Sequence, residues 1–191
     1  VRLDFKCSSI HLLWKNHFFV NEFTLDPRPE SELLIEIVLN YIQDKNKDIQ
    51  ILDLGSGVGL PGVVISIVLP DTTVRLVERR RRRGAFLEIV RSQLDLNNTE
   101  VFLGDVRQLG GETYEVVTAL AFGALGKIYD STVHLHAEQV TIISRKSADW
   151  AIEVGQLEDR LGVKATMTKE MPLGAHGRLI TVQLPGGIEY Q

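Results

Sequence analysis

The residues best suited to hold a cofactor lie between positions 51 and 62. Gly55, Gly57 and Gly59 alternate in a turn that follows an apolar run, and Asp53 lies just before the turn. Glycines in such a turn let the backbone approach a ligand that side chains would exclude. A buried strand, this turn and a following helix predict a nucleotide-cofactor pocket, although a glycine-rich turn can also serve only as a tight strand-to-helix connection.

Acidic residues also follow the next two apolar runs. Glu78 comes after the predicted strand 73–77, and Asp105 comes after the predicted strand 100–103. In nucleotide-binding α/β folds, an acid about 20 residues beyond the first glycine holds the ribose hydroxyls. An acid after each of three consecutive strands suits a ligand built on adenosine, with one acid near its amino-acid end, one at the ribose and one at the adenine edge.

The spacing of the glycines distinguishes between cofactors. The dinucleotide fingerprint is spaced G-x-G-x-x-G and cradles a pyrophosphate. The G-x-G-x-G spacing behind Asp53 resembles instead the S-adenosylmethionine loop of class I methyltransferases. The loop therefore favours a methyl donor over NAD.

Apolar and helical segments alternate along the chain, which predicts an α/β domain with a mainly parallel sheet covered on both faces. We expect one such domain over residues 29–191, preceded by a short helical extension over residues 1–28, because Pro27 and Pro29 break any continuous helix between them. The helices are expected at 8–22, 30–44, 61–68, 80–95, 125–135 and 149–161. The strands are expected at 50–54, 73–77, 100–103, 114–120, 139–144, 163–171 and 178–184.

Composition narrows the setting of this domain. The chain has 191 residues and a net charge of −4, so any contact with nucleic acid must come from a local patch. The single cysteine, Cys7, excludes a disulfide framework, and we expect no metal site. The longest apolar stretch, residues 63–69, is far shorter than a membrane span. We expect a cytoplasmic monomer that does not bind membranes.

Five consecutive arginines, residues 79–83, begin the helix that follows Glu78. Their charge opposes the helix macrodipole, which favours acids at that end. The run is interpreted either as a phosphate-binding patch or as a solvated helix face with Glu78 and Glu88 as partial counterions. Lys146 ends a strand of a parallel sheet, where the ligand crevice lies, and is a further candidate for a basic contact.

The stretch 54–62 includes a Leu-Pro-Gly extension that general methyltransferases lack. It resembles the glucose-inhibited division protein B family of 16S ribosomal RNA guanine-N7 methyltransferases. Glu78, the basic helix start and Phe86-Leu87 are similar to the corresponding family positions, and Ala121-Phe122 matches the end of its Ser-Arg-Ala-Phe motif. The resemblance covers about residues 11–184 and is strongest over 51–87.

The resemblance implies a class I S-adenosylmethionine-dependent methyltransferase fold, Rossmann-like, with a seven-stranded sheet. It implies S-adenosylmethionine as cofactor and 16S ribosomal RNA or the small ribosomal subunit as partner, hence a role in rRNA processing and ribosome biogenesis. The cofactor contacts that follow are Asp53, Gly55, Gly57, Gly59, Leu60, Glu78, Asp105, Val106, Arg107 and Leu120. The RNA contacts that follow are Arg79, Arg80, Arg82, Lys146 and Arg178.

No residue is assigned as catalytic. Guanine N7 offers a free lone pair at the major-groove edge, so methyl transfer to it needs positioning and no general base. Leu120 stands where the family has the arginine of Ser-Arg-Ala-Phe, so a charged contact becomes apolar. The alternatives are a non-catalytic, cofactor-binding relative that associates with the ribosome, and a small-molecule methyltransferase with an enclosed apolar pocket.

Overall fold

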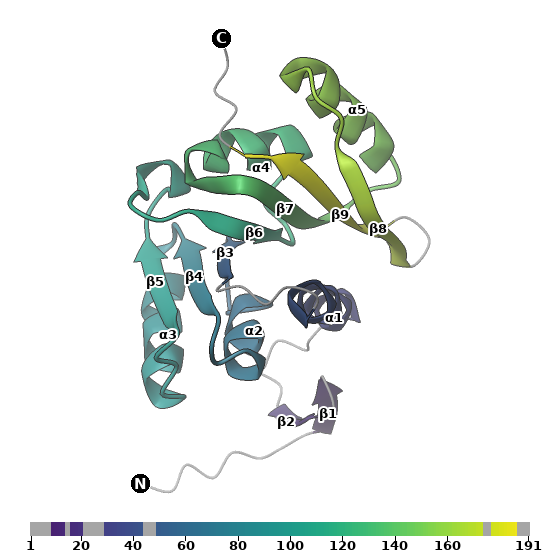
Figure 1. Cartoon of the computed structure of the whole chain (residues 1–191). Coiled ribbons are helices and arrows are strands. Elements are labelled where there is room, and N and C mark those ends of the chain that lie inside the picture. The colour runs from purple at the N-terminus through teal and green to yellow at the C-terminus, as the bar shows by residue number, and fades with distance from the viewer. Residues whose placement is uncertain (1–8, 14–15, 21–28, 44–48, 174–176, 187–191) are drawn as a thin grey trace, which may run out of the picture.

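The computed structural model describes residues 9–13, 16–20, 29–43, 49–173 and 177–186, and a seven-stranded sheet lies at its centre (Figure 1). The strands of this sheet are β3 (Gln50–Leu54), β4 (Thr73–Glu78), β5 (Thr99–Leu103), β6 (Tyr114–Ala119), β7 (His136–Lys146), β8 (Thr166–Leu173) and β9 (Gly177–Pro185). The α-helices are α1 (Pro29–Gln43), α2 (Gly62–Val68), α3 (Arg81–Gln93), α4 (Leu125–Thr132) and α5 (Trp150–Leu161). Two short 3-10 helices span Val106–Gln108 and Val133–Leu135.

The strand order is β5-β4-β3-β6-β7-β9-β8, in which β3 to β7 are parallel and β9 is antiparallel to both of its neighbours. The chain moves outward from β3 to β5 and then crosses back to place β6 on the other side of β3. Such a reversal opens a crevice beyond the carboxyl ends of the parallel strands, where ligands bind in open α/β sheets. The predicted glycine turn follows β3, at this reversal.

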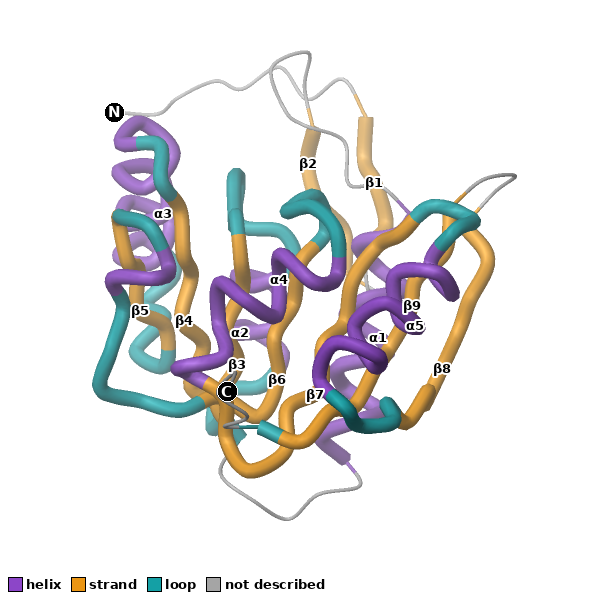
Figure 2. Tube along the Cα trace, turned by 90° about the horizontal axis from the view of Figure 1, so that it is seen from above, coloured by secondary structure: helices purple, strands orange, loops and turns teal. Residues whose placement is uncertain are grey.

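The core has two parts, one on each face of the sheet. Leu125, Ile128 and Leu157 of α4 and α5 pack on one face with side chains from the strands. Leu34 and Ile35 of α1 and Ile65 of α2 pack on the other. Figure 2 shows α4 and α5 on the near side of the sheet, with α1 and α2 behind it. Burial on both faces explains why residues 51–54 of β3 are apolar apart from Asp53.

The predicted α/β class and mainly parallel seven-stranded sheet are confirmed, and the helices and strands from residue 29 onward lie close to their predicted ranges. The prediction of a helix at 8–22 is wrong where the structure describes that segment. β1 (Ser9–Leu13) and β2 (Asn16–Val20) form an antiparallel pair there. β-branched and aromatic residues such as Ile10, Phe18 and Phe19 favour strands, and five-residue segments are too short to establish a helical period. No helix in the described ranges has the length and apolar character that a bilayer crossing requires.

Candidate functional site

The glycine turn after β3 adopts a backbone that only glycine accommodates easily. Gly55, Gly57 and Gly59 have φ angles of 66°, 60° and 95°. The amides of Gly55 and Ser56 both donate to the carbonyl oxygen of Val77, at 2.9 and 3.1 Å, which fastens the turn to the end of β4. These left-handed conformations strain any residue with a side chain.

Gly59 and Leu60 pack the end of the turn against the protein core. A methyl group added at Gly59 would lie 2.5 Å from Val63 Cγ2 and 3.3 Å from Leu87 Cδ2. Leu60 is half-buried against the core cluster that contains α2. Gly59 therefore permits close packing of the turn on α2, in contrast to Gly57, where an added methyl group would have no atom nearer than 3.6 Å.

Glu78 joins the glycine turn to the start of α3. Its Oε2 accepts a hydrogen bond from the Gly57 amide at 3.1 Å, and its Oε1 accepts one from the Arg80 amide at 2.8 Å. The residue is 5% exposed, and Arg83 Nη1 lies 3.9 Å from Oε2. A carboxylate has about four acceptor positions, so two are still available for ligand hydroxyls.

Asp105 caps the 3-10 helix that follows β5. Its Oδ1 accepts from the Arg107 amide at 3.1 Å and from Arg107 Nε at 2.9 Å, while Oδ2 lies 2.7 Å from Arg107 Nη2. The hydrogen bonds from the Arg107 guanidinium, followed by that from its backbone amide, hold the pKa of Asp105 well below its usual value. Val106, between the two, is buried.

These elements surround a cavity of about 890 Å³ at the carboxyl edge of the sheet. The wall nearest β4 and β5 is formed by Gly55, Val77, Glu78, Arg79, Arg80, Arg83, Asp105, Val106 and Arg107. The wall nearest β6 and α4 is formed by Ala121, Phe122, Lys127, Asp130 and Ser131. The volume is within the range of small-molecule and cofactor pockets. Of the predicted cofactor contacts, Gly55, Glu78, Asp105, Val106 and Arg107 thus share one cavity.

Asp53 is placed differently from the prediction. Its carboxylate is 1% exposed and does not line the cavity, and its Oδ1 accepts a hydrogen bond from Thr118 Oγ1 at 2.7 Å. Burial raises the pKa of Asp53, although the hydrogen bonds from Thr118 and Ser56 oppose that effect. Asp53 therefore stabilises the end of β3, next to the turn, through this hydrogen bond to Thr118 of β6.

The arginine run divides between two directions. Arg79, Arg80 and Arg83 line the cavity, whereas Arg81 and Arg82 are exposed elsewhere on the first turn of α3. Arg79 and Arg80 precede α3, and Arg83 lies three residues after Arg80, a spacing that brings side chains to one side of a helix. Arg82, a predicted RNA contact, lies outside the cavity lining.

Leu120 does not line the cavity, contrary to the prediction. It follows β6 and packs, partly buried, against the core cluster that contains Ile143 and Leu179. The next two residues, Ala121 and Phe122, form part of the cavity wall instead. β6 ends at Ala119, so the alternation of a strand does not extend to these residues, and the position of the family's arginine packs against the core here.

Lys146 also departs from the prediction of an RNA contact. Its side chain is 2% exposed, and its ammonium lies 3.1 Å from Glu153 Oε2. A phosphate cannot reach a group enclosed in this way without a rearrangement. Arg178 pairs with Lys146 across β7 and β9, is 27% exposed and donates from Nε to Glu170 Oε1 at 3.0 Å. It lies at the same edge of the sheet but outside the cavity lining.

Two lining residues of the cavity, Asp130 and Ser131 of α4, had no local signal in the sequence. Phe122 was recognisable only as part of the family motif, and Arg83 only as a member of the arginine run. Lys127, whose ammonium lies 5.6 Å from the centre of the Phe122 ring, was recognisable only as a basic residue. Within the described ranges, no three His, Cys, Asp or Glu side chains gather as a metal site would require.

Comparison with known proteins gives a family match over most of the chain. Residues 32–181 match the model of the GidB family, rRNA small subunit methyltransferase G. The ribosomal RNA small subunit methyltransferase G of Burkholderia vietnamiensis is 32% identical over 168 residues, which cover 82% of this chain and 72% of that protein. The protein of the same name from Beutenbergia cavernae is 37% identical over 99 residues, covering 51% of this chain and 47% of that protein. The matched part is thus from about half to three quarters of these relatives' lengths.

Solved structures share the fold at low sequence identity. The putative methyltransferase yhhF from Escherichia coli aligns with a TM-score of 0.63 and 17% identity, over 90% of this chain and 93% of that one. TYW2 from M. jannaschii, solved in complex with AdoMet, aligns with a TM-score of 0.63 and 13% identity, over 97% of this chain and 90% of that one. These neighbours establish a class I methyltransferase fold.

Proposed function

The chain belongs to the GidB family of rRNA small subunit methyltransferase G, and we propose that it transfers a methyl group from S-adenosylmethionine to N7 of a guanine in 16S ribosomal RNA. The observation that carries the proposal is the cavity at the end of β3 and β4, where a glycine turn, a partly satisfied buried carboxylate and a cationic rim meet. Each of these features corresponds to one part of the reaction.

The residues present fit S-adenosylmethionine. Gly55, at the start of the glycine turn, lines the cavity, so the backbone of the turn lies where a ligand would bind. A methyl group added at Gly57 would meet only ordinary contacts, the nearest 3.6 Å away at the Gly55 carbonyl oxygen. Glu78 retains acceptor positions suited to two ribose hydroxyls. Asp105 and Val106 line the cavity beyond Glu78, where the side-chain acid and the backbone would flank an adenine. When bound, the cofactor supplies an electrophilic methyl group on a sulfonium.

The chain's own contribution to the reaction is to hold guanine N7 in line with that methyl group. The N7 lone pair forms the new bond, the carbon–sulfur bond breaks with its electron pair going to sulfur, and no proton needs to move. Positioning of the reacting atoms at about 3–3.5 Å supplies the rate enhancement. The absence of histidine from the cavity lining within the described residues is compatible with a reaction of this kind.

The cationic rim favours an RNA substrate over a small apolar one. Five of the lining side chains are cationic, namely Arg79, Arg80, Arg83, Arg107 and Lys127, against the three acids Glu78, Asp105 and Asp130. Arginine forks suit phosphate oxygens, and contacts of this kind position a nucleic acid without reading its sequence. A small-molecule methyltransferase would be expected to enclose its substrate in an apolar pocket.

The test is transfer of a labelled methyl group from S-adenosylmethionine to naked 16S rRNA and to isolated small ribosomal subunits. Chemical cleavage at 7-methylguanosine then identifies the modified atom and nucleotide. We expect label in the small-subunit rRNA and cleavage at one guanine. Binding of S-adenosylhomocysteine without methylation of RNA, subunits or their assembly intermediates would support the non-catalytic alternative, and label only in small molecules would reject the RNA substrate.

A further inference from the structure

A buried ion pair connects β7 and α5 to the segment that leads from β6 into α4. Lys146, the last residue of β7, donates a hydrogen bond to the carbonyl oxygen of Gly123 and lies 3.1 Å from Glu153 Oε2. Burial lowers the pKa of Lys146, and the hydrogen bond and charge of Glu153 oppose that effect. A charge removed from water in this way is costly unless it is paired and hydrogen-bonded, as Lys146 is.

Glu153 makes a second contact to the same segment. Its Oε2 also accepts a hydrogen bond from the backbone amide of Leu125, the first residue of α4, at 2.6 Å. The amides at a helix N-terminus have no partner within the helix, and an acid is the favoured partner for them. The ion pair thus binds the segment at two backbone atoms, one on Gly123 and one on Leu125.

The tethered segment carries part of the cavity wall. Ala121 and Phe122 line the cavity, and Phe122 Cδ2 lies 3.8 Å from the place where a side chain on Gly55 would begin. Gly123 has a φ of 140°, a conformation that favours glycine and turns the chain sharply after Phe122. The position of Phe122 beside the glycine turn therefore depends on what fixes residues 121–125.

We propose that Lys146 and Glu153 are positioning residues that fix the 121–125 segment and thereby hold Phe122 against the cofactor-binding turn. This inference rests on the proposed function for the identity of the ligand. Lys146 then contributes to cofactor binding indirectly, through Gly123 and Phe122, and does not contact RNA phosphate. The pair acts without touching the cofactor itself.

The decisive variant replaces both members of the pair, Lys146→Met with Glu153→Met. Removing one partner would leave an uncompensated buried charge, whereas removing both with side chains of similar length leaves none. The matched control is Glu158→Ala. Glu158 lies on α5, as Glu153 does, and its ion pair is with the exposed Lys164. Calorimetry with S-adenosylhomocysteine, thermal unfolding and hydrogen exchange at the Leu125 amide are measured on each full chain.

We expect the double variant to stay folded, to exchange the Leu125 amide faster and to bind S-adenosylhomocysteine about tenfold more weakly, which corresponds to about 1.4 kcal/mol. Lys146→Met with Glu153→Gln, which keeps an acceptor for the Leu125 amide and leaves no unpaired buried charge, should recover part of the affinity. Glu158→Ala should bind as the wild type does. These readouts need no methyl transfer, so they remain informative if the RNA activity is not found.

Two results would overturn the inference. One is a folded double variant with wild-type affinity for S-adenosylhomocysteine and an unchanged Leu125 exchange rate. The other comes from RNA binding measured against salt concentration. Loss of one phosphate contact lowers the log–log slope by about 0.7 on single strands and about 0.9 on duplex. Such a decrease in the double variant, with cofactor affinity intact, would assign Lys146 to phosphate.

Discussion

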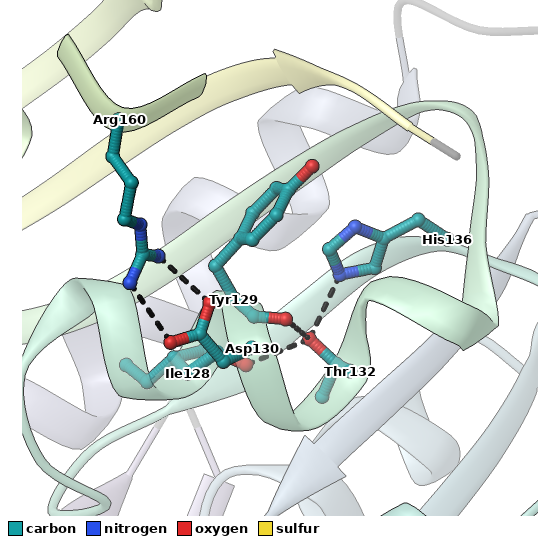
Figure 3. A network of polar contacts seen from close by, with 6 residues as sticks. All are labelled: Ile128, Tyr129, Asp130, Thr132, His136 and Arg160. Carbon is teal, nitrogen blue, oxygen red and sulfur yellow. Dashed lines mark hydrogen bonds and ion pairs between the residues drawn. The ribbon is translucent and has the colours of Figure 1, made fainter. Parts of the chain in front are cut away.

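Protonation of His136 should destabilise the folded chain in weakly acidic solution. Thr132 Oγ1 donates its hydrogen to the carbonyl oxygen of Ile128 at 2.8 Å, so the contact of 2.8 Å with His136 Nε2 requires that nitrogen to donate (Figure 3). Nδ1 then carries the lone pair, and within the described residues it has no hydrogen-bond partner. His136 is 6% exposed, and its ring packs edge-on against Tyr129, at 5.0 Å between ring centres.

The magnitude follows from the difference between folded and unfolded pKa values. Burial, with a smaller contribution from the charge of His134, lowers the pKa of His136 from 6.5 to about 4. The unfolded chain takes up this proton below pH 6.5 and the folded chain only near pH 4. The stabilisation from neutral His136 is therefore complete above pH 6.5 and is lost as the pH falls to 4. A difference of about 2.5 pKa units corresponds to about 3 kcal/mol.

The assay compares chemical denaturation of the wild type and of His136→Phe from pH 8 to pH 4. Phenylalanine keeps the aromatic contact and cannot take a proton. For a chain of this size, about 3 kcal/mol corresponds to a change of about 6–12 °C in Tm. We expect the wild type to lose that much more stability than His136→Phe between pH 6.5 and pH 4. The exposed His134→Gln variant, as the matched control, should keep most of the wild-type loss.

The test compares how steeply the free energy of unfolding falls with pH in the wild type and in His136→Phe. Every other titrating group is present in both proteins, so the difference between the two slopes reports on His136. Equal losses of stability in the two proteins would refute the reasoning. That result would mean that the folded protein accommodates a protonated His136, for example with a water molecule that accepts a hydrogen bond from Nδ1.

Three further predictions concern the site. Gly59→Ala, which combines a positive φ with a clash at Val63, should destabilise the fold by about 1–3 kcal/mol in denaturant and weaken binding of S-adenosylhomocysteine; wild-type stability would contradict the tight packing of the turn. Leu120→Arg should lower stability by about 1–3 kcal/mol and give no increase in methyl transfer, because the side chain points into the core; increased transfer would place it at the cofactor instead. Arg80→Glu and Arg83→Glu should each reduce the slope of RNA affinity against salt, by about 0.7 per contact on single strands, because both side chains line the cavity; an unchanged slope in both would return the run to the solvated-face interpretation.

Much of the cofactor site is encoded locally. The glycines at 55, 57 and 59 lie in one turn, Glu78 is the last residue of β4, and Asp105 lies two residues after the end of β5. Parallel strands bring their carboxyl ends to one edge of the sheet, so such residues converge whenever the strands are neighbours. The βα alternation that makes the strands parallel is readable from apolar runs and helical periods. For this reason the fold class could be predicted from the amino-acid sequence alone, and half of the predicted cofactor contacts lie together in one cavity.

The remaining residues depend on contacts between distant segments. The sequence places Lys146 at a strand end but does not show that Glu153, on the next helix, encloses its charge. Leu120 and Phe122 are two positions apart, yet the end of β6 sends the first into the core and the second to the cavity. The strand order that places β6 beside β3 determines both outcomes. Hydrophobic pattern and turn chemistry are local properties that can be recognised directly in the sequence. The burial of a given side chain and its pairing with another arise only when segments far apart in the chain pack together.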